Sequence, residues 1–250
     1  MGTECLAYKV SVIKFRETHF TYYLNRLILN YKRLPYSTTW VEFPDIESTM
    51  RSINAPPSSR RADGRPVFTL PVIVDPLRSP ANPVMLSNPS IIAEYLEVTY
   101  PARLLFPDGS KALQTLFAHY LQEVFVRPLL PVMAPQSHQR LPERSQAHFF
   151  PQGQRPPDPY AAGPNREQAW HAVHENFNFL SSIMDKNNGD DGDGTVVSGR
   201  DITYSDFALC AILIWIEKMS PQDGWPRVKQ WHGGRWTRLW ERCRDYMDIY

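Results

Sequence analysis

Cysteine is scarce in this chain, which has thiols only at Cys5, Cys210 and Cys243. An odd number of cysteines without paired spacing argues against a disulfide framework, and the sequence has no C-x-x-C pair for dithiol redox chemistry. Cys210 lies within an apolar helical pattern and is expected to be a buried thiol. His171 and His174 lie three residues apart without a cluster of carboxylates or cysteines, so we expect no metal site.

An excess of charge of one sign is also missing. The chain has 27 basic and 26 acidic residues and a formal net charge of +1, which gives no support for nucleic acid or an anionic membrane as its main partner. The longest apolar run, residues 207–216, is too short to cross a bilayer. Lys9 and Lys14 interrupt the N-terminal apolar stretch, which therefore lacks the core of a signal peptide. We expect a cytoplasmic protein without a membrane partner.

Proline is abundant, with 23 residues, and we expect most of them to lie in long irregular connections. In the first hundred residues, β-branched and aromatic segments alternate with amphipathic ones, which indicates strands alternating with helices. The expected strands are 8–15, 37–43, 68–76 and 83–86, and the expected helices are 18–32, 45–54 and 88–99.

Beyond residue 101 the pattern is helical only, with helices expected at 110–127, 164–187, 203–219 and 235–248. A change from mixed to all-helical character marks a domain boundary. The sequence therefore predicts an α/β domain at 1–101, with the order β-α-β-α-β-β-α, followed by an all-α domain at 108–250.

Three short motifs lie within this pattern. Pro71, in the segment TLPVI at 69–73, would remove a hydrogen-bond donor from a strand interior, so we expect it at the start of a strand. Asn88 and Pro89 suit the N-cap and the first position of a helix. Thr203 and Asp206 have the spacing of a capping box, with Asp in place of the usual Glu, and we expect a role in folding for them.

The element order and these motifs resemble the glutathione transferase superfamily. The segments LNYKRLPY at 29–36 and WVEFPDIE at 40–47 are similar to one fungal branch, the Fua class of basidiomycetes, which is related to bacterial β-etherases. The resemblance extends over residues 24–250. It implies a thioredoxin-like N-terminal domain, an all-helical C-terminal domain and a homodimer that binds glutathione.

The resemblance also implies roles for particular residues. A cis peptide bond is expected at Leu70–Pro71, and the backbone of Leu70 would pair with the cysteinyl unit of glutathione. The N-terminus of the helix after Asn88 would receive the γ-glutamyl carboxylate, because free N–H groups and the helix dipole favour an anion. Asn88 would meet the γ-glutamyl amine, and Ser90 would contribute its N–H and hydroxyl.

Two positions depart from the family pattern. Pro89 stands where the family has serine, and proline lacks both the hydroxyl and the backbone N–H that would bind the carboxylate. The serine that donates to the glutathione sulfur falls at His19, flanked by Thr18 and Thr21, and residues 1–23 do not match the family segment. Thr18 or Thr21 would supply the catalytic hydroxyl, or His19 would donate instead, or Thr18 only caps the helix. We expect weakened glutathione binding.

The implied activity is attack of the glutathione thiolate on a hydrophobic aromatic substrate, or thiol-dependent cleavage of an aryl ether, with glutathione as co-substrate. One alternative is a non-catalytic protein on the same fold that holds aromatic compounds or a protein partner. Another is an altered copy whose first residues come from a misread start. Five aromatic residues of the helical domain could line a pocket for a small aromatic ligand or, as is more common, belong to the core: Phe117, Tyr120, Phe125, Phe149 and Phe150.

Overall fold

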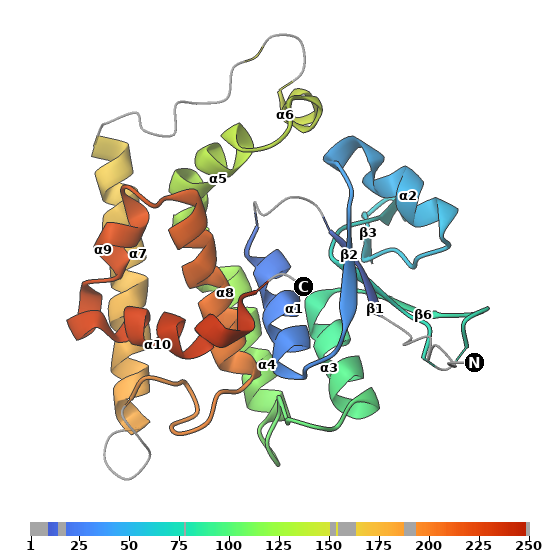
Figure 1. Cartoon of the computed structure of the whole chain (residues 1–250). Coiled ribbons are helices and arrows are strands. Elements are labelled where there is room, and N and C mark those ends of the chain that lie inside the picture. Colours follow the sequence, from blue (N-terminus) through green and yellow to red (C-terminus); the bar gives the residue numbers. More distant parts are fainter. Residues whose placement is uncertain are drawn as a thin grey trace.

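The computed structural model describes residues 10–14, 19–77, 79–150, 154, 164–187 and 194–248. Cys5 and Thr18 lie outside the described residues. An α/β part comes first, and a helical part follows it and lies beside it (Figure 1). The expected fold class, a thioredoxin-like α/β domain followed by an all-α domain, is confirmed.

The α/β part is built on a four-stranded sheet with the order β2-β1-β5-β6. β1 and β2 are parallel, whereas the β1–β5 and β5–β6 pairs are antiparallel. In this register Val12 lies opposite Thr38 on one side and Ile73 on the other. The strands are β1 Val10–Lys14, β2 Tyr36–Trp40, β5 Val72–Asp75 and β6 Val84–Ser87.

Alternation along β5 divides the core between the two faces of the sheet. Ile73 belongs to the main apolar core, together with residues of α1 (Phe20–Tyr31), α3 (Pro89–Thr99) and the helical part. Val72 points the other way and packs with Met50 of α2 (Ile46–Ser52) in a smaller cluster. This is the arrangement expected when successive side chains of a strand point to opposite faces.

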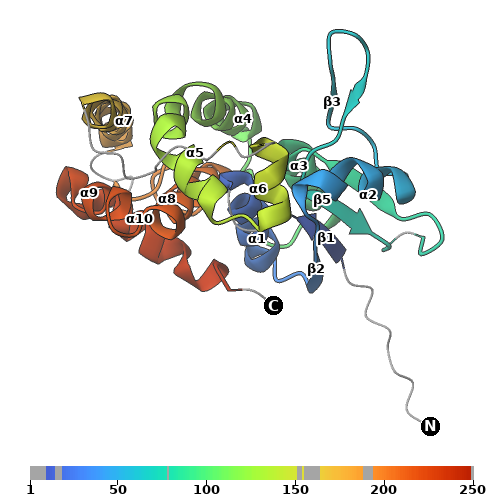
Figure 2. The same cartoon turned by 90° about the horizontal axis from the view of Figure 1, so that it is seen from above.

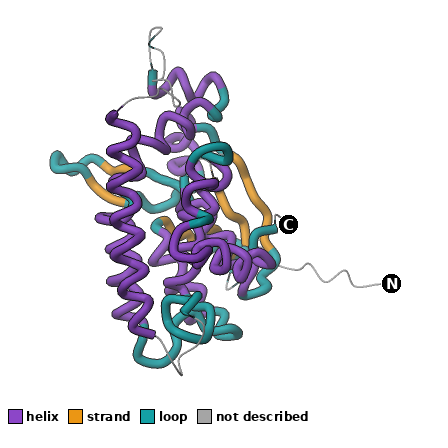
Figure 3. The backbone as a smooth tube through the Cα atoms, turned by 90° about the vertical axis from the view of Figure 1, so that its left-hand side faces the viewer, coloured by secondary structure: helices purple, strands orange, loops and turns teal. Residues whose placement is uncertain are grey.

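The helical part is organised around α8, whose residues from Tyr204 to Ile216 are all buried. A helix that is apolar on every side belongs in the interior, and here α1, α4, α5, α9 and α10 all contact α8. Figure 3 views the molecule from the helical part, whose helices lie in front of the strands of the sheet. The helices are α4 Lys111–Tyr120, α5 Leu130–Gln139, α6 Glu143–Phe149, α7 Pro164–Met184, α8 Tyr204–Met219, α9 Gly224–Val228 and α10 Arg235–Cys243. In the described part of the chain, no helix has the length and apolarity needed to span a membrane.

Several elements differ from the sequence expectation. The helix expected at 110–127 changes after Tyr120 into a π-helical turn, Leu121–Phe125, followed by a 3₁₀ turn at Arg127–Leu129. The helices α5 and α6 were not expected, because prolines crowd this region. Pro131 lies in the first turn of α5, where a missing N–H costs little, and Pro135 is tolerated inside the helix. A small hairpin, β3 Ser59–Arg60 and β4 Pro66–Val67, projects from the loop after α2 (Figure 2).

Thr203 and Asp206 form the capping box at the start of α8. The Asp206 carboxylate accepts hydrogen bonds from the Thr203 N–H at 2.9 Å, the Thr203 hydroxyl at 2.9 Å and the Val197 N–H at 2.7 Å. Asp206 is fully buried, and this burial raises the pKa of its carboxyl to about 6 in spite of the three donors. The box therefore joins the loop before α8 to the first turn of the central helix.

Replacing Asp206 by alanine should lower the free energy of unfolding by about 2–3 kcal/mol, which is more than the roughly 0.5–2 kcal/mol of a lost cap alone, because buried donors also lose their acceptor. Chemical denaturation monitored by circular dichroism measures this change. Glu241→Ala, which removes an exposed carboxylate from α10, is the matched control and should leave the midpoint unchanged. Equal midpoints for Asp206→Ala and the unmodified protein would show that the box does not stabilise α8.

Candidate functional site

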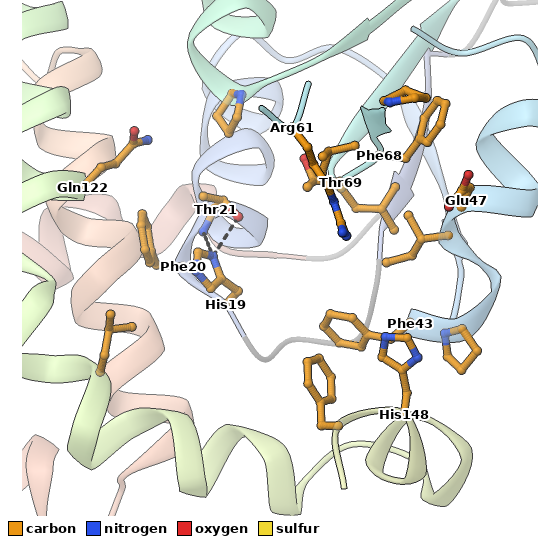
Figure 4. Close-up of a pocket in the computed structure, with 18 of the residues that line it drawn as sticks. His19, Phe20, Thr21, Phe43, Glu47, Arg61, Phe68, Thr69, Gln122 and His148 are labelled. Atoms are coloured by element: carbon orange, nitrogen blue, oxygen red, sulfur yellow. Dashed lines mark hydrogen bonds between the residues drawn. The ribbon is translucent and has the colours of Figure 1, made fainter. Parts of the chain in front are cut away.

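A cleft of about 790 Å³ lies between the α/β part and the helical part. On one side it is lined by the start of α1, the turn into α2, the β3–β4 hairpin and the segment that leads into β5. On the other side it is lined by residues of the π-helical turn, α5 and α6. Figure 4 shows these side chains converging from both parts. The cleft is therefore an interdomain site, lined by polar and apolar side chains of both parts.

The segment before β5 forms one wall of the cleft through Thr69 and Leu70. The peptide bond between Leu70 and Pro71 is cis, as the sequence predicted. Pro71 does not line the cleft. It lies directly before Val72, the first residue of β5. The proline thus lies at the start of the strand, where the missing N–H removes no bond from the sheet ladder.

His19 and Thr21 bring polar atoms to the cleft from the start of α1. His19 is the N-cap of α1, and its Nδ1 lies 3.4 Å from the Thr21 backbone nitrogen and 2.9 Å from Thr21 Oγ1. The ring stacks on Phe20, with 4.4 Å between the ring centroids, and burial lowers the pKa of His19 to about 4. The helix therefore begins at a histidine that is neutral at neutral pH.

The start of α3 also reaches the cleft, but only through Pro89. Asn88 adopts a left-handed backbone conformation with φ of 80°, and its side chain accepts a hydrogen bond from the Ser90 N–H at 3.0 Å. Ser90 Oγ lies 3.2 Å from the hydroxyl of buried Tyr204 on α8. Asn88 and Ser90 thus lie beside the cleft. The first N–H of α3, that of Ser90, already donates to the side chain of the N-cap residue Asn88.

Arg61 projects into the cleft from the β3–β4 hairpin (Figure 4). Its neighbours on the hairpin are engaged, since Arg60 donates to the Gly64 carbonyl and Arg65 pairs with Asp63. Within the described ranges, the Arg61 guanidinium has no hydrogen-bond or ion-pair partner. A free cation at the polar end of a cleft is suited to a ligand carboxylate. No sequence motif distinguished Arg61 from the other arginines of the hairpin.

The apolar end of the cleft is closed by α6. Phe149 of α6 meets Phe43 edge-on, with 4.8 Å between the ring centroids, and both line the cleft. Arg144 pairs with Asp45 across the two parts, and Ser145 Oγ donates to the Glu42 carboxylate at 2.9 Å. These contacts fix the helix that carries Phe149 against the α/β part.

The five aromatic residues that the sequence singled out in the helical part differ in where they lie. Phe149 lines the cleft, as expected. Phe125 is buried in the core, and Phe117 and Tyr120 pack against that core, so the core alternative holds for these three. Phe150 lies against His138. Their helical spacing in the sequence is equally consistent with a core face, which is why the sequence could not separate them.

Cys210 and Cys243 are free and buried. Among the residues that the structure describes, no group of three or more His, Cys, Asp or Glu side chains is arranged to hold a metal ion.

Comparisons with known proteins identify the family. The family model for the glutathione S-transferase C-terminal domain matches residues 112–246, which is more than half of the chain. The glutathione S-transferase-like protein ustS of Aspergillus flavus is 26% identical over 236 residues, which cover 89% of this chain and 82% of that protein.

Two solved fungal structures are similar over almost their whole length. A glutathione S-transferase of Ceriporiopsis subvermispora, solved in complex with glutathione, matches with a TM-score of 0.86 and 27% identity, covering 97% of this chain and 99% of that chain. Glutathione transferase GSTFuA3 of Phanerochaete chrysosporium matches with a TM-score of 0.85 and 26% identity, covering 97% and 98%. The likeness to the Fua class is therefore confirmed, and the chain belongs to the glutathione S-transferase family.

Proposed function

We propose that the interdomain cleft binds glutathione at its polar end and presents the thiol to a hydrophobic aromatic substrate at its apolar end. The observation that carries this proposal is the set of residues that line the interdomain cleft. Thr69, Leu70 and the start of α1 line one end, and Phe43 and Phe149 close the other. The similar enzyme of Ceriporiopsis subvermispora was solved with glutathione bound, which supports the first half of the proposal.

Calorimetry with glutathione tests the binding step, and a conjugation assay with an aromatic electrophile tests the reaction. We expect saturable binding of glutathione and a low rate of conjugation. Binding without any conjugation would favour the non-catalytic alternative, in which the same cleft only holds an aromatic compound. Absence of binding at high glutathione concentration would overturn the proposal.

The carboxylate anchor at α3 is weaker than a serine anchor would be. Pro89 has neither hydroxyl nor N–H, and the Ser90 N–H is engaged by Asn88 Oδ1 at 3.0 Å. A hydrogen bond to a charged group contributes about 1.5–3 kcal/mol, so two missing bonds correspond to roughly two to four orders of magnitude in affinity. Glutathione binding should accordingly be weak.

Pro89→Ser should tighten glutathione binding by about tenfold to a hundredfold if one bond to the carboxylate is regained, and by up to about 10⁴-fold if both are. Calorimetric dissociation constants of the two proteins measure the effect. Pro80→Ser changes an exposed proline that does not line the cleft and should have no effect. Unchanged affinity in Pro89→Ser would mean that another group anchors the ligand.

Arg61→Gln should weaken glutathione binding by about tenfold, since the side chain is exposed and water screens part of its attraction for a carboxylate. Arg65→Gln, on the same hairpin but paired with Asp63, is the control with an equal loss of charge. A titration at two salt concentrations separates the local contact from the general effect of net charge. An equal loss of glutathione affinity in Arg61→Gln and Arg65→Gln would contradict a specific role for Arg61.

A homodimer is also part of the proposal, and an exposed apolar surface supports it. The helices α7, α4 and α3 follow one another along one side of the molecule (Figure 2). Contacts join them in pairs, because Tyr120 of α4 meets Phe179 of α7 and Lys111 of α4 pairs with Glu94 of α3. Contiguous exposed apolar residues of this kind mark interaction surfaces. The large exposed side chains on the three helices are Ile91, Val98, Leu113, Leu116, Phe179 and Ile183.

Light scattering at micromolar concentration should give twice the chain mass of 28.9 kDa for the unmodified protein. Leu116→Glu should shift the distribution to the monomer, because a carboxylate would be buried without a partner in the interface. Leu77→Glu changes an equally large exposed apolar residue in the loop after β5 and should leave the dimer intact. A single 28.9 kDa species for the unmodified protein would refute the dimer.

A further inference from the structure

The start of α1 contains a histidine whose tautomer is set by its neighbour. Nδ1 of His19 lies 3.4 Å from the Thr21 backbone nitrogen and accepts its N–H. A nitrogen that accepts a hydrogen bond carries no proton, so the proton of the neutral ring lies on Nε2. The Thr21 hydroxyl, 2.9 Å from the same Nδ1, must then donate to it. Two donors from one residue therefore fix the orientation and the tautomer of the ring.

The surroundings of His19 keep the ring neutral. Phe20 stacks on it at 4.4 Å, and Trp215 of α8 lies 6.0 Å away between ring centroids. Neither supplies a negative charge that would favour the imidazolium. The other titratable or charged side chains that line the same cleft are Glu47, Arg61 and His148.

The remaining ring nitrogen is available to a ligand. His19 lines the cleft, and in the described part of the chain Nε2 has no hydrogen-bond partner. Thr21 cannot serve in its place, because a hydroxyl has one proton and Thr21 donates its proton to Nδ1. The N–H of Nε2 is therefore a free side-chain donor that the described start of α1 offers to the cleft.

We propose that the Nε2–H of His19 donates a hydrogen bond to the glutathione sulfur, and that Thr21 is a positioning residue that fixes the imidazole tautomer. This inference rests on the proposed function. The donor stabilises the thiolate relative to the thiol, and thiolate is the reactive form. When the thiolate forms, the thiol proton leaves to solvent and Nε2 keeps its own proton. The sulfur lone pair then forms the bond to the electrophilic carbon, and the leaving group departs with its electron pair.

The tautomer can be measured without any ligand. Nitrogen-15 NMR of the histidine rings in the free protein should show His19 as the Nε2–H tautomer. Thr21→Val, which keeps the backbone N–H but removes the hydroxyl, should give a mixture of tautomers, whereas Thr21→Ser should retain the single form. Addition of glutathione should shift the Nε2 resonance of the unmodified protein. An Nδ1–H tautomer in the free protein would overturn the inference.

The ionisation of bound glutathione tests the contact with sulfur. The thiolate absorbs in the ultraviolet, so a pH titration of the complex gives the apparent pKa of the bound thiol. His19→Phe keeps the stacked ring but removes the donor, and should raise that pKa by about one to two units. Thr21→Val should raise it less, with Thr21→Ser close to the unmodified protein. His148→Phe changes a histidine at the apolar end of the cleft and should have no effect.

His19→Phe also removes the cap of α1, so His19→Asp is the second variant, because aspartate caps helices well and has no proton to donate. A thiol pKa that is unchanged in both His19 variants, while glutathione still binds, overturns this inference alone. A large rise of the thiol pKa in Thr21→Val, with no rise in His19→Phe, would assign the donor to Thr21 and would also overturn the inference. If the unmodified protein binds no glutathione, the proposed function fails, and the inference fails with it.

Discussion

The buried ion pair between Lys32 and Glu97 fixes how the two parts of the molecule meet. The Lys32 side chain is fully buried at the end of α1, and its Nζ lies 2.7 Å from Glu97 Oε2 and 2.9 Å and 3.1 Å from the carbonyls of Tyr100 and Arg103. The Ala102 carbonyl is a fourth, longer contact at 3.5 Å, so every proton of the ammonium group has an acceptor. Glu97 in turn accepts from the Leu105 N–H, in the connection to the helical part. Removing either partner would leave an uncompensated buried charge, which is strongly destabilising.

A series of hydrogen bonds connects the Lys32–Glu97 pair to the cleft. The Leu105 carbonyl accepts from the Tyr204 N–H, so the connection between the two parts also fixes the start of α8. The hydroxyl of Tyr204 lies near Ser90 beside the cleft, and Asp206, two residues after Tyr204, completes the capping box. The same contacts that stabilise the interdomain junction therefore place the start of α3 against the helical part. The position of the cleft therefore depends on the same contacts that stabilise the fold.

Local features were predictable where neighbouring residues alone decide the outcome. The caps at Asn88 and Thr203, the strand start at Pro71 and the buried helix α8 all follow from side-chain chemistry within a few residues. The helices α5 and α6 were missed because proline normally argues against a helix, whereas packing against α7, α8 and the 3₁₀ turn at Arg127–Leu129 supports α5 here. The sequence left open whether Phe125 lines a ligand pocket or belongs to the core, because an aromatic residue on a helix face has the same spacing in both cases.

The sequence by itself determined the family, the order of the elements and the two departures at His19 and Pro89, because these depend on which residues stand at which positions. Only the tertiary structure decided that Arg61 faces the cleft while Arg60 and Arg65 are engaged. It also decided that the Thr21 hydroxyl lies 2.9 Å from Nδ1 of His19 and that α6 closes the apolar end against Phe43. Each of these outcomes depends on the direction of a side chain relative to a distant segment, and that direction is set by packing between the two parts rather than by local sequence.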